Sequence, residues 1–336
     1  MENTSLGDLI EALGTNSSTV YVAPLIKYEY PDSDYLYNLY KPIFEDYPSI
    51  EVKSLSVFSH YKPFFAALIS RDVIFHYHWL EFQDLKSLLG MPWKLLWIFL
   101  FKLIGGKLVW TIHNEQPHDQ KFLKLHLFLH KKMARWAKAL HVHCKTAAQI
   151  MSKTLNSPIS KFYVIPHPYF PSKLVSRNEA ILELKRKYGL TLDESRPIAL
   201  IFGQISHYKQ IEAILADFIG GKSETIQFLI AGTVKKGNQE LGDYLKDISA
   251  KNPHIHLVTR FISDSELPYF LNAANVCLFN YKEVLTSGGV YMALSYNIPI
   301  IAPKLGCIIE FEKQQDIHLF ETDAERNTLL KTISLA

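Results

Sequence analysis

Hydrophobic residues along this chain fall into short runs that alternate with longer amphipathic segments. The runs are rich in β-branched and aromatic residues, as in buried strands, and the segments between them are long enough for helices. This alternation predicts parallel sheets whose strands are joined by crossover helices. The chain is therefore expected to be an α/β protein throughout.

The hydrophobic runs divide into two sets, separated by the proline-dense segment 166–171. The first set predicts one sheet with strands at 19–25, 51–57, 72–78, 107–113, 139–143 and 162–165. The second follows a charged helical run, 178–188, with strands at 197–202, 226–231, 255–259, 276–279 and 298–302. Proline disfavours both helix and central strand, so the segment rich in it is expected to connect two domains. We predict two doubly wound Rossmann-like domains, residues 1–170 and 171–336.

Composition narrows the class of protein. A chain of 336 residues with 48% hydrophobic content is long enough for two cores, since domains usually comprise about 100–200 residues. The net charge of +3 lacks the strongly basic balance of nucleic-acid-binding domains, so no nucleic-acid partner is expected. The three cysteines form no CxxC pair, which argues against a zinc knuckle.

The 14 histidines raise the question of a metal site. They include the pairs His76/His78, His141/His143 and His254/His256 on predicted strands, and His126/His130 on a predicted helix. The strand pairs lack a carboxylate or cysteine at ligand spacing, and the helical pair lacks the intervening glutamate of a metalloprotease. We expect core or cleft histidines and no metal. His167, between the two halves, could reach a cleft or simply pack.

The N-terminal 19 residues are polar and lack the apolar core of a signal peptide, so a cytoplasmic protein is expected. The strongest apolar run, 91–104, is shorter than the roughly 20 residues that span a bilayer. It contains Lys94 and Lys102 among aromatic residues, and a basic amphipathic helix is predicted at 121–138. Two readings stay open: core helices, or peripheral contact with the inner face of the plasma membrane.

One candidate anion site follows the predicted strand 197–202. Gly203 comes directly after this strand, and Lys209 lies six residues later, where a helix is expected to begin. Glycine lets a ligand approach the backbone, a helix N-terminus favours anions, and a lysine can reach a phosphate. The alternative is an ordinary turn with a solvated lysine.

A second candidate anion site precedes a predicted helix at 290–296. Thr286, Ser287 and Gly288 place small hydroxyls and backbone N–H groups at the start of this helix. The alternative is ordinary N-capping by serine or threonine. Because both loops follow strands of one predicted sheet, the two sites are expected at the same edge of that sheet.

The order of these landmarks resembles the donor-binding domain of GT-B glycosyltransferases, particularly retaining family 4 and the related bacterial exopolysaccharide glycosyltransferases. The likeness covers residues 197 to about 306 and includes FLIAG, HIHLVTRFISDSELPYFLNAANVCLFNY and TSGGVYMALSYNIPIIAP. The first half contains DVIFHYHW, KLVWTIHNEQPHD, KALHVHCKTAAQIM and FYVIPHP, which resemble the acceptor domain of the same enzymes.

This resemblance implies two domains facing each other across a cleft, with a nucleoside-diphosphate sugar as co-substrate rather than a cofactor. It implies that Lys209, Ser287 and Gly288 bind the donor phosphates and that His113 faces the transferred sugar. Lys209 and the helix dipole would take the charge that a metal otherwise takes, so no metal is obligatory. The expected reaction is hexosyl transfer to a glycan or lipid-linked saccharide in polysaccharide or glycoconjugate biosynthesis.

The chain departs from the family at two places. Gln204 replaces the arginine that follows the loop glycine, which removes one positive charge. Glu283 matches the first of the family's two glutamates only with a shift of one residue, and Tyr291 or Met292 occupies the place of the second. Retention or inversion of the anomeric configuration therefore stays open.

An inverting transfer needs a general base close to the acceptor hydroxyl. Glu115 and Asp119 follow His113 in the loop after a predicted strand, so either is a candidate, with helix capping as the alternative. Asp32 and Asp34, after the first strand, are lesser candidates.

Two other functions remain alternatives: a degenerate glycosyltransferase-like binding subunit, and a sugar-nucleotide epimerase on the same fold. The epimerase would need acid/base carboxylates that we cannot place. A dinucleotide-dependent dehydrogenase is disfavoured, because no GxGxxG follows a predicted strand.

Overall fold

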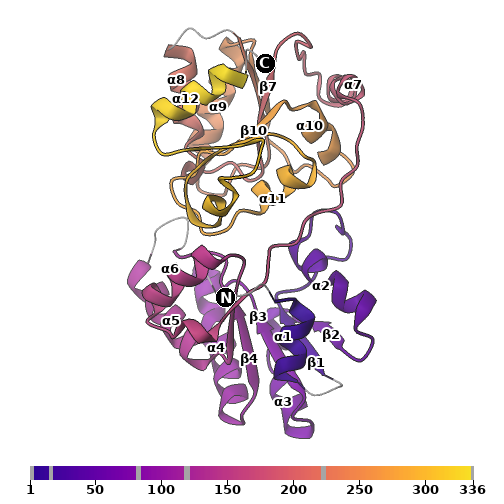
Figure 1. The fold of residues 1–336 in the computed structure, drawn as a ribbon, viewed down its shortest axis with the longest axis vertical. Coiled ribbons are helices and arrows are strands. Elements are labelled where there is room, and N and C mark those ends of the chain that lie inside the picture. Colours follow the sequence, from indigo (N-terminus) through magenta and orange to yellow (C-terminus); the bar gives the residue numbers. More distant parts are fainter. Residues whose placement is uncertain (1–3, 15–17, 81–84, 117–121, 221–224, 334–336) are drawn as a thin grey trace. The chain divides into compact units, whose positions relative to one another are not determined.

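The computed structural model describes residues 4–14, 18–80, 85–116, 122–220 and 225–333. The chain divides into two compact units, Met1–Pro168 and Tyr169–Ala336. Each unit contains a six-stranded sheet with helices packed along it (Figure 1). All strand pairs in both sheets are parallel.

The N-terminal unit has the strand order β2-β1-β3-β4-β5-β6. Its strands are β1 (Thr19–Ala23), β2 (Glu51–Ser54), β3 (Val73–Tyr77), β4 (Lys107–Thr111), β5 (Ala139–Val142) and β6 (Phe162–Val164). Its helices are α1 (Leu6–Leu13), α2 (Tyr35–Asp46), α3 (Lys62–Ile69), α4 (Leu85–Leu103), α5 (Leu123–Trp136) and α6 (Lys145–Leu155). Short 3-10 turns lie at η1 (Val57–Ser59) and η2 (Ile159–Lys161).

The C-terminal unit has the strand order β12-β11-β10-β7-β8-β9. Its strands are β7 (Ile198–Phe202), β8 (Gln227–Ala231), β9 (Ile255–Val258), β10 (Val276–Leu278), β11 (Ile300–Pro303) and β12 (Ile317–Phe320). Its helices are α7 (Arg177–Tyr188), α8 (Ile211–Gly220), α9 (Gln239–Lys251), α10 (Leu267–Ala273), α11 (Gly288–Ser295) and α12 (Asp323–Ile333). Two 3-10 turns, η3 (His207–Lys209) and η4 (Gly306–Phe311), follow β7 and β11.

Residues on both faces of the C-terminal sheet are buried. Along β7, Ile198 and Leu200 belong to the core on one face, whereas Ala199 and Ile201 belong to the core on the other. Parallel sheets covered by helices on both faces have such continuously apolar strands. This explains why unbroken hydrophobic runs, rather than alternating ones, identified the strands in the sequence.

The predicted fold class and all eleven predicted strands are confirmed, but a twelfth strand, β12, was missed. It lies at the edge of the C-terminal sheet and pairs only with β11. Only its end residues, Ile317 and Phe320, are buried. A run with two buried positions gives too weak a hydrophobic signal to identify a strand.

In each sheet the strand order reverses once, so that the connections after two neighbouring strands run toward opposite edges of the sheet. In the N-terminal sheet this switch point lies between β1 and β3, and in the C-terminal sheet between β7 and β10. Crossover helices leave a crevice at such points, outside the carboxyl ends of the strands, and ligands of open α/β sheets bind there. The topology therefore directs attention to the loops after these four strands.

Candidate functional site

The loop after β7 turns sharply and brings a lysine back to the end of its own strand. Gly203 has φ +85°, and Lys209 donates a hydrogen bond of 2.6 Å from Nζ to the Phe202 carbonyl. A Cβ on Gly203 would lie 3.1 Å from Lys209 Nζ, and one on Gly232 of the neighbouring loop would lie 2.1 Å from the Gly203 carbonyl oxygen. Gly232 is required because the backbone of Gly203 leaves no room for a side chain, and Gly203 is favoured because other residues rarely adopt its positive φ.

Lys209 is buried, and burial lowers the pKa of its amine to about 7 because the charged form loses solvation. None of the ion pairs in the described part of the chain includes Lys209. An anion bound beside this amine would stabilise its protonated form. The loop thus holds a cation that lacks a counter-ion within the described ranges.

The second loop of interest joins β10 to α11. Ser287 is the N-cap of α11: its Oγ accepts a hydrogen bond from the Val290 amide at 3.3 Å and lies 2.8 Å from the Tyr281 hydroxyl. The capping role considered for Ser287 in the sequence is therefore present. Thr286 Oγ1 lies 3.3 Å from Cys307 Sγ, whereas Gly288 is exposed at the first turn of the helix.

The two loops lie side by side at the switch point. The rings of Tyr208 and Tyr281 are stacked, with centroids 5.6 Å apart and planes 14° apart. The Lys282 amide donates to the Tyr208 carbonyl at 2.8 Å, and Asn280 Nδ2 donates to the Gln210 carbonyl at 3.2 Å. The structure therefore brings together the two segments that the sequence suggested as anion sites.

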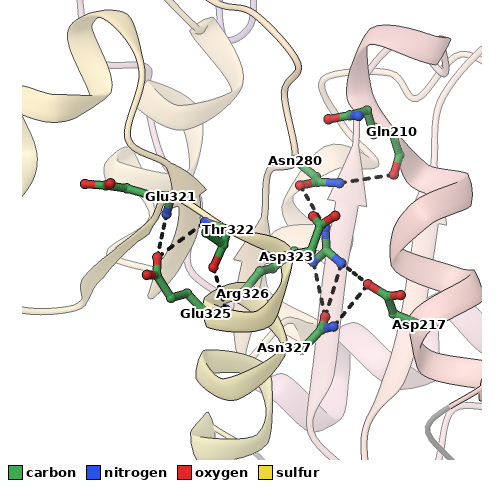
Figure 2. Close-up of polar contacts among 9 residues, drawn as sticks. All are labelled: Gln210, Asp217, Asn280, Glu321, Thr322, Asp323, Glu325, Arg326 and Asn327. Atoms are coloured by element: carbon green, nitrogen blue, oxygen red, sulfur yellow. Dashed lines mark hydrogen bonds and ion pairs between the residues drawn. The ribbon is translucent and has the colours of Figure 1, made fainter.

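A buried arginine lies behind this junction and was not recognised in the sequence (Figure 2). Arg326 of α12 is fully buried, donates to Asn280 Oδ1 at 3.1 Å, and pairs with Asp217 of α8 and Asp323 of α12. Asn280 in turn holds the carbonyl of Gln210, the residue that follows Lys209. Arg326 thus supports the turn that carries the lysine. In the sequence, an arginine in a charged terminal helix looks like an ordinary solvated residue.

The two departures from the family pattern differ in their surroundings. Gln204 is exposed in the loop after β7. Tyr291 and Met292 are buried in the core of the C-terminal unit, and the Tyr291 ring contacts Phe311 with centroids 5.5 Å apart. The place of the second glutamate is therefore filled by packing residues. Glu283 lies partly buried in the loop before α11.

In the N-terminal unit, His113 follows β4 and is partly buried. Its ring stacks on Trp79, with centroids 4.2 Å apart and planes 10° apart, and its Nε2 lies 3.2 Å from His78 Nδ1. Burial, assisted by the neighbouring histidines, holds the pKa of His113 well below its usual range. His113 is therefore a neutral imidazole near pH 7 and a weak base.

His113 belongs to a cluster of histidines whose neighbouring ring centroids are 4.4 to 5.6 Å apart. The members of this histidine cluster are His76, His78, His113, His141, His143 and His167. Burial lowers the pKa of His76 to about 3 and that of His143 to about 4, so these residues are uncharged at neutral pH. Within the described ranges, no group of three His, Cys, Asp or Glu side chains is arranged to hold a metal ion.

Hydrogen bonds connect much of the histidine cluster. His76 Nε2 lies 2.7 Å from Thr111 Oγ1, which lies 2.8 Å from His141 Nδ1. His143 bonds the Tyr35 hydroxyl at 3.0 Å. The strand histidines are therefore buried packing residues, as expected, and they form a polar network that no single spacing in the sequence indicates.

The candidate general bases are not brought beside His113 by any described contact. Glu115 Oε1 accepts a hydrogen bond of 2.8 Å from Thr154 of α6. Asp119 lies outside the described residues. Asp34 is the N-cap of α2 and accepts from the Tyr37 amide at 2.7 Å, so its observed role is structural. A base for an inverting transfer stays a prediction.

Comparison with known proteins gives curated sequence relatives and several structural neighbours. No protein-family model matches the sequence. A GDP-mannose:glycolipid 4-beta-D-mannosyltransferase of Xanthomonas campestris pv. campestris is 21% identical over 245 residues, which cover 70% of this chain and 63% of that protein. The chain thus spans less than two-thirds of the length of this relative.

Two solved structures resemble the chain over most of its length. HepE of Anabaena, in complex with UDP-glucose, has a TM-score of 0.66 at 14% identity and covers 95% of this chain and 89% of its own. A UDP-forming α,α-trehalose-phosphate synthase of Burkholderia vietnamiensis has a TM-score of 0.67 at 10% identity, with 95% and 91% covered. At these identities the likeness establishes the fold, which is the GT-B fold predicted from the sequence.

Proposed function

We propose that this chain is a glycosyltransferase that moves a hexosyl group from a nucleoside-diphosphate sugar to a glycan or lipid-linked saccharide. The observation that carries the proposal is the buried Lys209 beside the loop that begins α11, at the switch point of the C-terminal sheet. A cation, a helix N-terminus and small residues in one crevice form a site for a diphosphate.

In this proposal the C-terminal unit binds the donor. The diphosphate lies between Lys209 and the first turn of α11, and Gly203 and Gly288 let it approach the backbone. When the glycosidic bond to the donor breaks, negative charge grows on the leaving diphosphate. The Lys209 ammonium and the N-terminus of α11 stabilise that charge. These preorganised groups supply the electrostatic stabilisation of the leaving diphosphate that a metal ion would otherwise supply.

The N-terminal unit binds the acceptor, with His113 hydrogen bonding to the transferred sugar. As a neutral imidazole, His113 is suited to hydrogen bonding rather than to proton abstraction. An inverting reaction would take its base from Glu115 or Asp119. The named substrates of the curated relative, GDP-mannose and a glycolipid, and the UDP-glucose bound to HepE suggest which donors to test.

We expect one nucleoside diphosphate among GDP, UDP and ADP to raise the melting temperature of the protein, and its sugar derivative to do the same. A ligand present at 100 times its Kd stabilises a fold by about 2.7 kcal/mol, because only the folded state binds it. Thermal shift measurements with each nucleotide at 1 mM (roughly 100 times a Kd of about 10 μM) identify the base.

The same ligands distinguish the alternatives. Release of the nucleoside diphosphate only when an acceptor is added supports the transferase, whereas a change in the sugar without an acceptor supports an epimerase. Stabilisation without either reaction supports a degenerate binding subunit. Absence of stabilisation by every nucleotide would contradict the donor site.

We also propose that the N-terminal unit binds the cytoplasmic face of an anionic membrane as a peripheral protein. Large apolar side chains are exposed on three neighbouring helices. These are Phe65, Leu68 and Ile69 on α3, Leu96, Phe99 and Leu103 on α4, and Leu125 and Phe128 on α5. Helix α3 packs on α4, and Phe99 contacts Trp136 of α5 with ring centroids 5.6 Å apart. Exposed apolar residues near lysines and arginines suit the interface of a bilayer.

Within the ranges given above, no helix has the length and hydrophobicity to cross a membrane.

The protein is expected to sediment with vesicles that contain anionic lipid and to stay in the supernatant with zwitterionic vesicles at low salt. The double substitution Phe99→Ser and Leu103→Ser should abolish sedimentation because it removes apolar area that enters the interface. Phe261→Ser, at an exposed position in the C-terminal unit, serves as the control. This surface would be contradicted if the wild type sedimented with neither kind of vesicle. It would also be contradicted if the double variant sedimented with anionic vesicles as fully as the Phe261→Ser control.

A further inference from the structure

A large pocket opens at the carboxyl ends of β1, β2 and β3, at the switch point of the N-terminal sheet. Its volume is about 820 Å³, within the range of roughly 300–1,000 Å³ that is usual for small-molecule sites. It is lined by residues 23–29 at and after the end of β1, and by residues 54–58 and His60 at and after the end of β2, together with Tyr77, Trp79 and Lys94. Its position matches where open α/β sheets bind ligands.

Most of the pocket wall is apolar. Pro24, Leu25, Leu55, Val57 and Phe58 all line it, and Leu25 and Phe58 are 51% and 83% exposed. Exposed hydrocarbon of this extent around a hollow is unfavourable in water and is typical of a surface that a ligand covers. The wall therefore suits an aliphatic chain.

One side of the pocket carries a desolvated cation. Lys94 of α4 is partly buried, and burial lowers the pKa of its amine. Its charge also contributes to the lowered pKa of His60, so the two groups lie close together. The ion pairs of the described residues do not include Lys94. Lys27 and Glu29 line the outer, exposed part. An anionic group placed at Lys94 would restore the solvation that this ammonium lacks.

The pocket shares a wall with the candidate sugar-facing residue. Trp79 lines the pocket and stacks on the His113 ring, with the two ring planes 10° apart. A molecule that fills the pocket therefore ends one aromatic side chain away from His113. This contact links an apolar site to the residue that the proposed function assigns to the transferred sugar.

We propose that this pocket binds the aliphatic chain of an amphiphilic phosphate ester, with the phosphate at Lys94 and the polar end directed past Trp79 toward His113. The assignment of this ligand as the acceptor rests on the proposed function. Binding itself does not, because the pocket, the apolar wall and the lysine all belong to the N-terminal unit.

Calorimetric titration of the full chain with octyl phosphate, octanol and inorganic phosphate tests the proposal directly. Octyl phosphate should bind saturably at a single site, and inorganic phosphate should not. Affinity should rise about fourfold for each methylene added between hexyl and octyl phosphate, as expected for burial of hydrocarbon. Octanol should bind about tenfold more weakly than octyl phosphate, because it lacks the charge-assisted hydrogen bond.

Substitutions separate the two parts of the pocket. Lys94→Met should reduce the affinity for octyl phosphate to that for octanol, and Lys94→Arg should retain most of it. Leu25→Trp, which adds volume at the mouth, should weaken binding of both compounds. Lys41→Met, at a lysine of α2 that pairs with Glu45, is the control and should change neither. Thermal unfolding of each variant shows whether it is folded.

The proposal is overturned if octyl phosphate does not bind the wild type, if chain length has no effect, or if Lys94→Met and Lys41→Met behave alike. Donor binding, measured by the nucleotide thermal shift, is independent of these titrations. If the wild type binds octyl phosphate but no nucleotide, the transferase proposal is refuted and the assignment of the pocket stands. If it binds a nucleotide but not octyl phosphate, the transferase proposal stands and the assignment of the pocket is refuted.

Discussion

Replacement of Lys209 with alanine is expected to lower the rate of sugar transfer by about 100- to 1,000-fold, the loss typical for one preorganised group that stabilises developing charge. Lys209 Nζ is bonded to the Phe202 carbonyl at 2.6 Å and is buried beside the loop that begins α11. Water cannot replace its charge there without rearranging the loop. Single-turnover transfer from saturating donor measures the effect, with Lys246→Ala, at an exposed lysine of α9, as the control.

The pKa of Lys209 adds a pH dependence that a mutation alone does not reveal. Burial lowers this pKa from 10.5 to about 7 in the free protein. A bound diphosphate favours the ammonium, so binding above pH 7 must be accompanied by uptake of a proton. Affinity for the nucleoside diphosphate should therefore fall with rising pH above 7, by up to about tenfold per unit. Lys209→Met should remove this dependence.

The free energy of unfolding of the free protein should rise with pH, whereas the affinity for the nucleoside diphosphate falls. Between pH 7 and 10.5 the unfolded chain keeps a proton on Lys209 that the folded chain has lost. The contribution of this residue to the free energy of unfolding therefore rises with pH, by about 1.4 kcal/mol per unit in this window. Denaturant unfolding of wild type and Lys209→Met at pH 7, 8 and 9 measures the difference. Identical pH profiles for the two proteins would show that Lys209 is solvated and charged throughout.

Replacement of His113 with alanine is expected to lower transfer by about 100-fold while leaving the nucleotide thermal shift unchanged, because a hydrogen bond to the transferring sugar is lost and the donor phosphates are bound elsewhere. His113 and the loops that we propose to bind the nucleotide belong to different units of the chain. A reduced thermal shift in this variant would instead indicate that His113 supports binding of the nucleotide itself.

The surroundings of His78 predict which nitrogen of His113 makes that hydrogen bond. His78 Nε2 is buried without a hydrogen-bond partner, whereas its Nδ1 lies 3.2 Å from His113 Nε2. A buried N–H without an acceptor is costly, so the proton of His78 is expected on Nδ1, where it donates to His113. His113 then carries its proton on Nδ1, which can donate to a sugar hydroxyl.

An amide side chain can test this tautomer. The Asn amide nitrogen occupies nearly the position of imidazole Nδ1, and that of Gln the position of Nε2. His113→Asn should therefore keep more activity than His113→Gln. His130→Asn on α5, which removes another buried histidine, controls for general loss of stability. Equal activity of the Asn and Gln variants would reject the assigned tautomer.

The sequence alone determined the class of fold and the location of the two candidate anion-binding loops. Long runs such as 197–202 and 226–231 are buried on both faces, so their hydrophobicity is continuous and independent of partners far along the chain. Gly203, Lys209 and Ser287 could be selected because each follows a strand, and parallel strands end at a common edge. Strand β12 has only two buried positions, so its sequence lacked this signal.

Tertiary structure decided the electrostatic state of the site. The lowered pKa of Lys209 results from burial, and burial depends on segments that the sequence separates, including Tyr281 stacked on Tyr208 and Arg326 bonded to Asn280. The histidine cluster likewise collects residues from β3 and β5 and from the segments that follow β3, β4, β5 and β6. Hydrophobic periodicity predicts which residues are buried, because burial depends on the local sequence pattern. It does not predict which buried polar groups contact one another, because those contacts depend on the order of strands in the sheet.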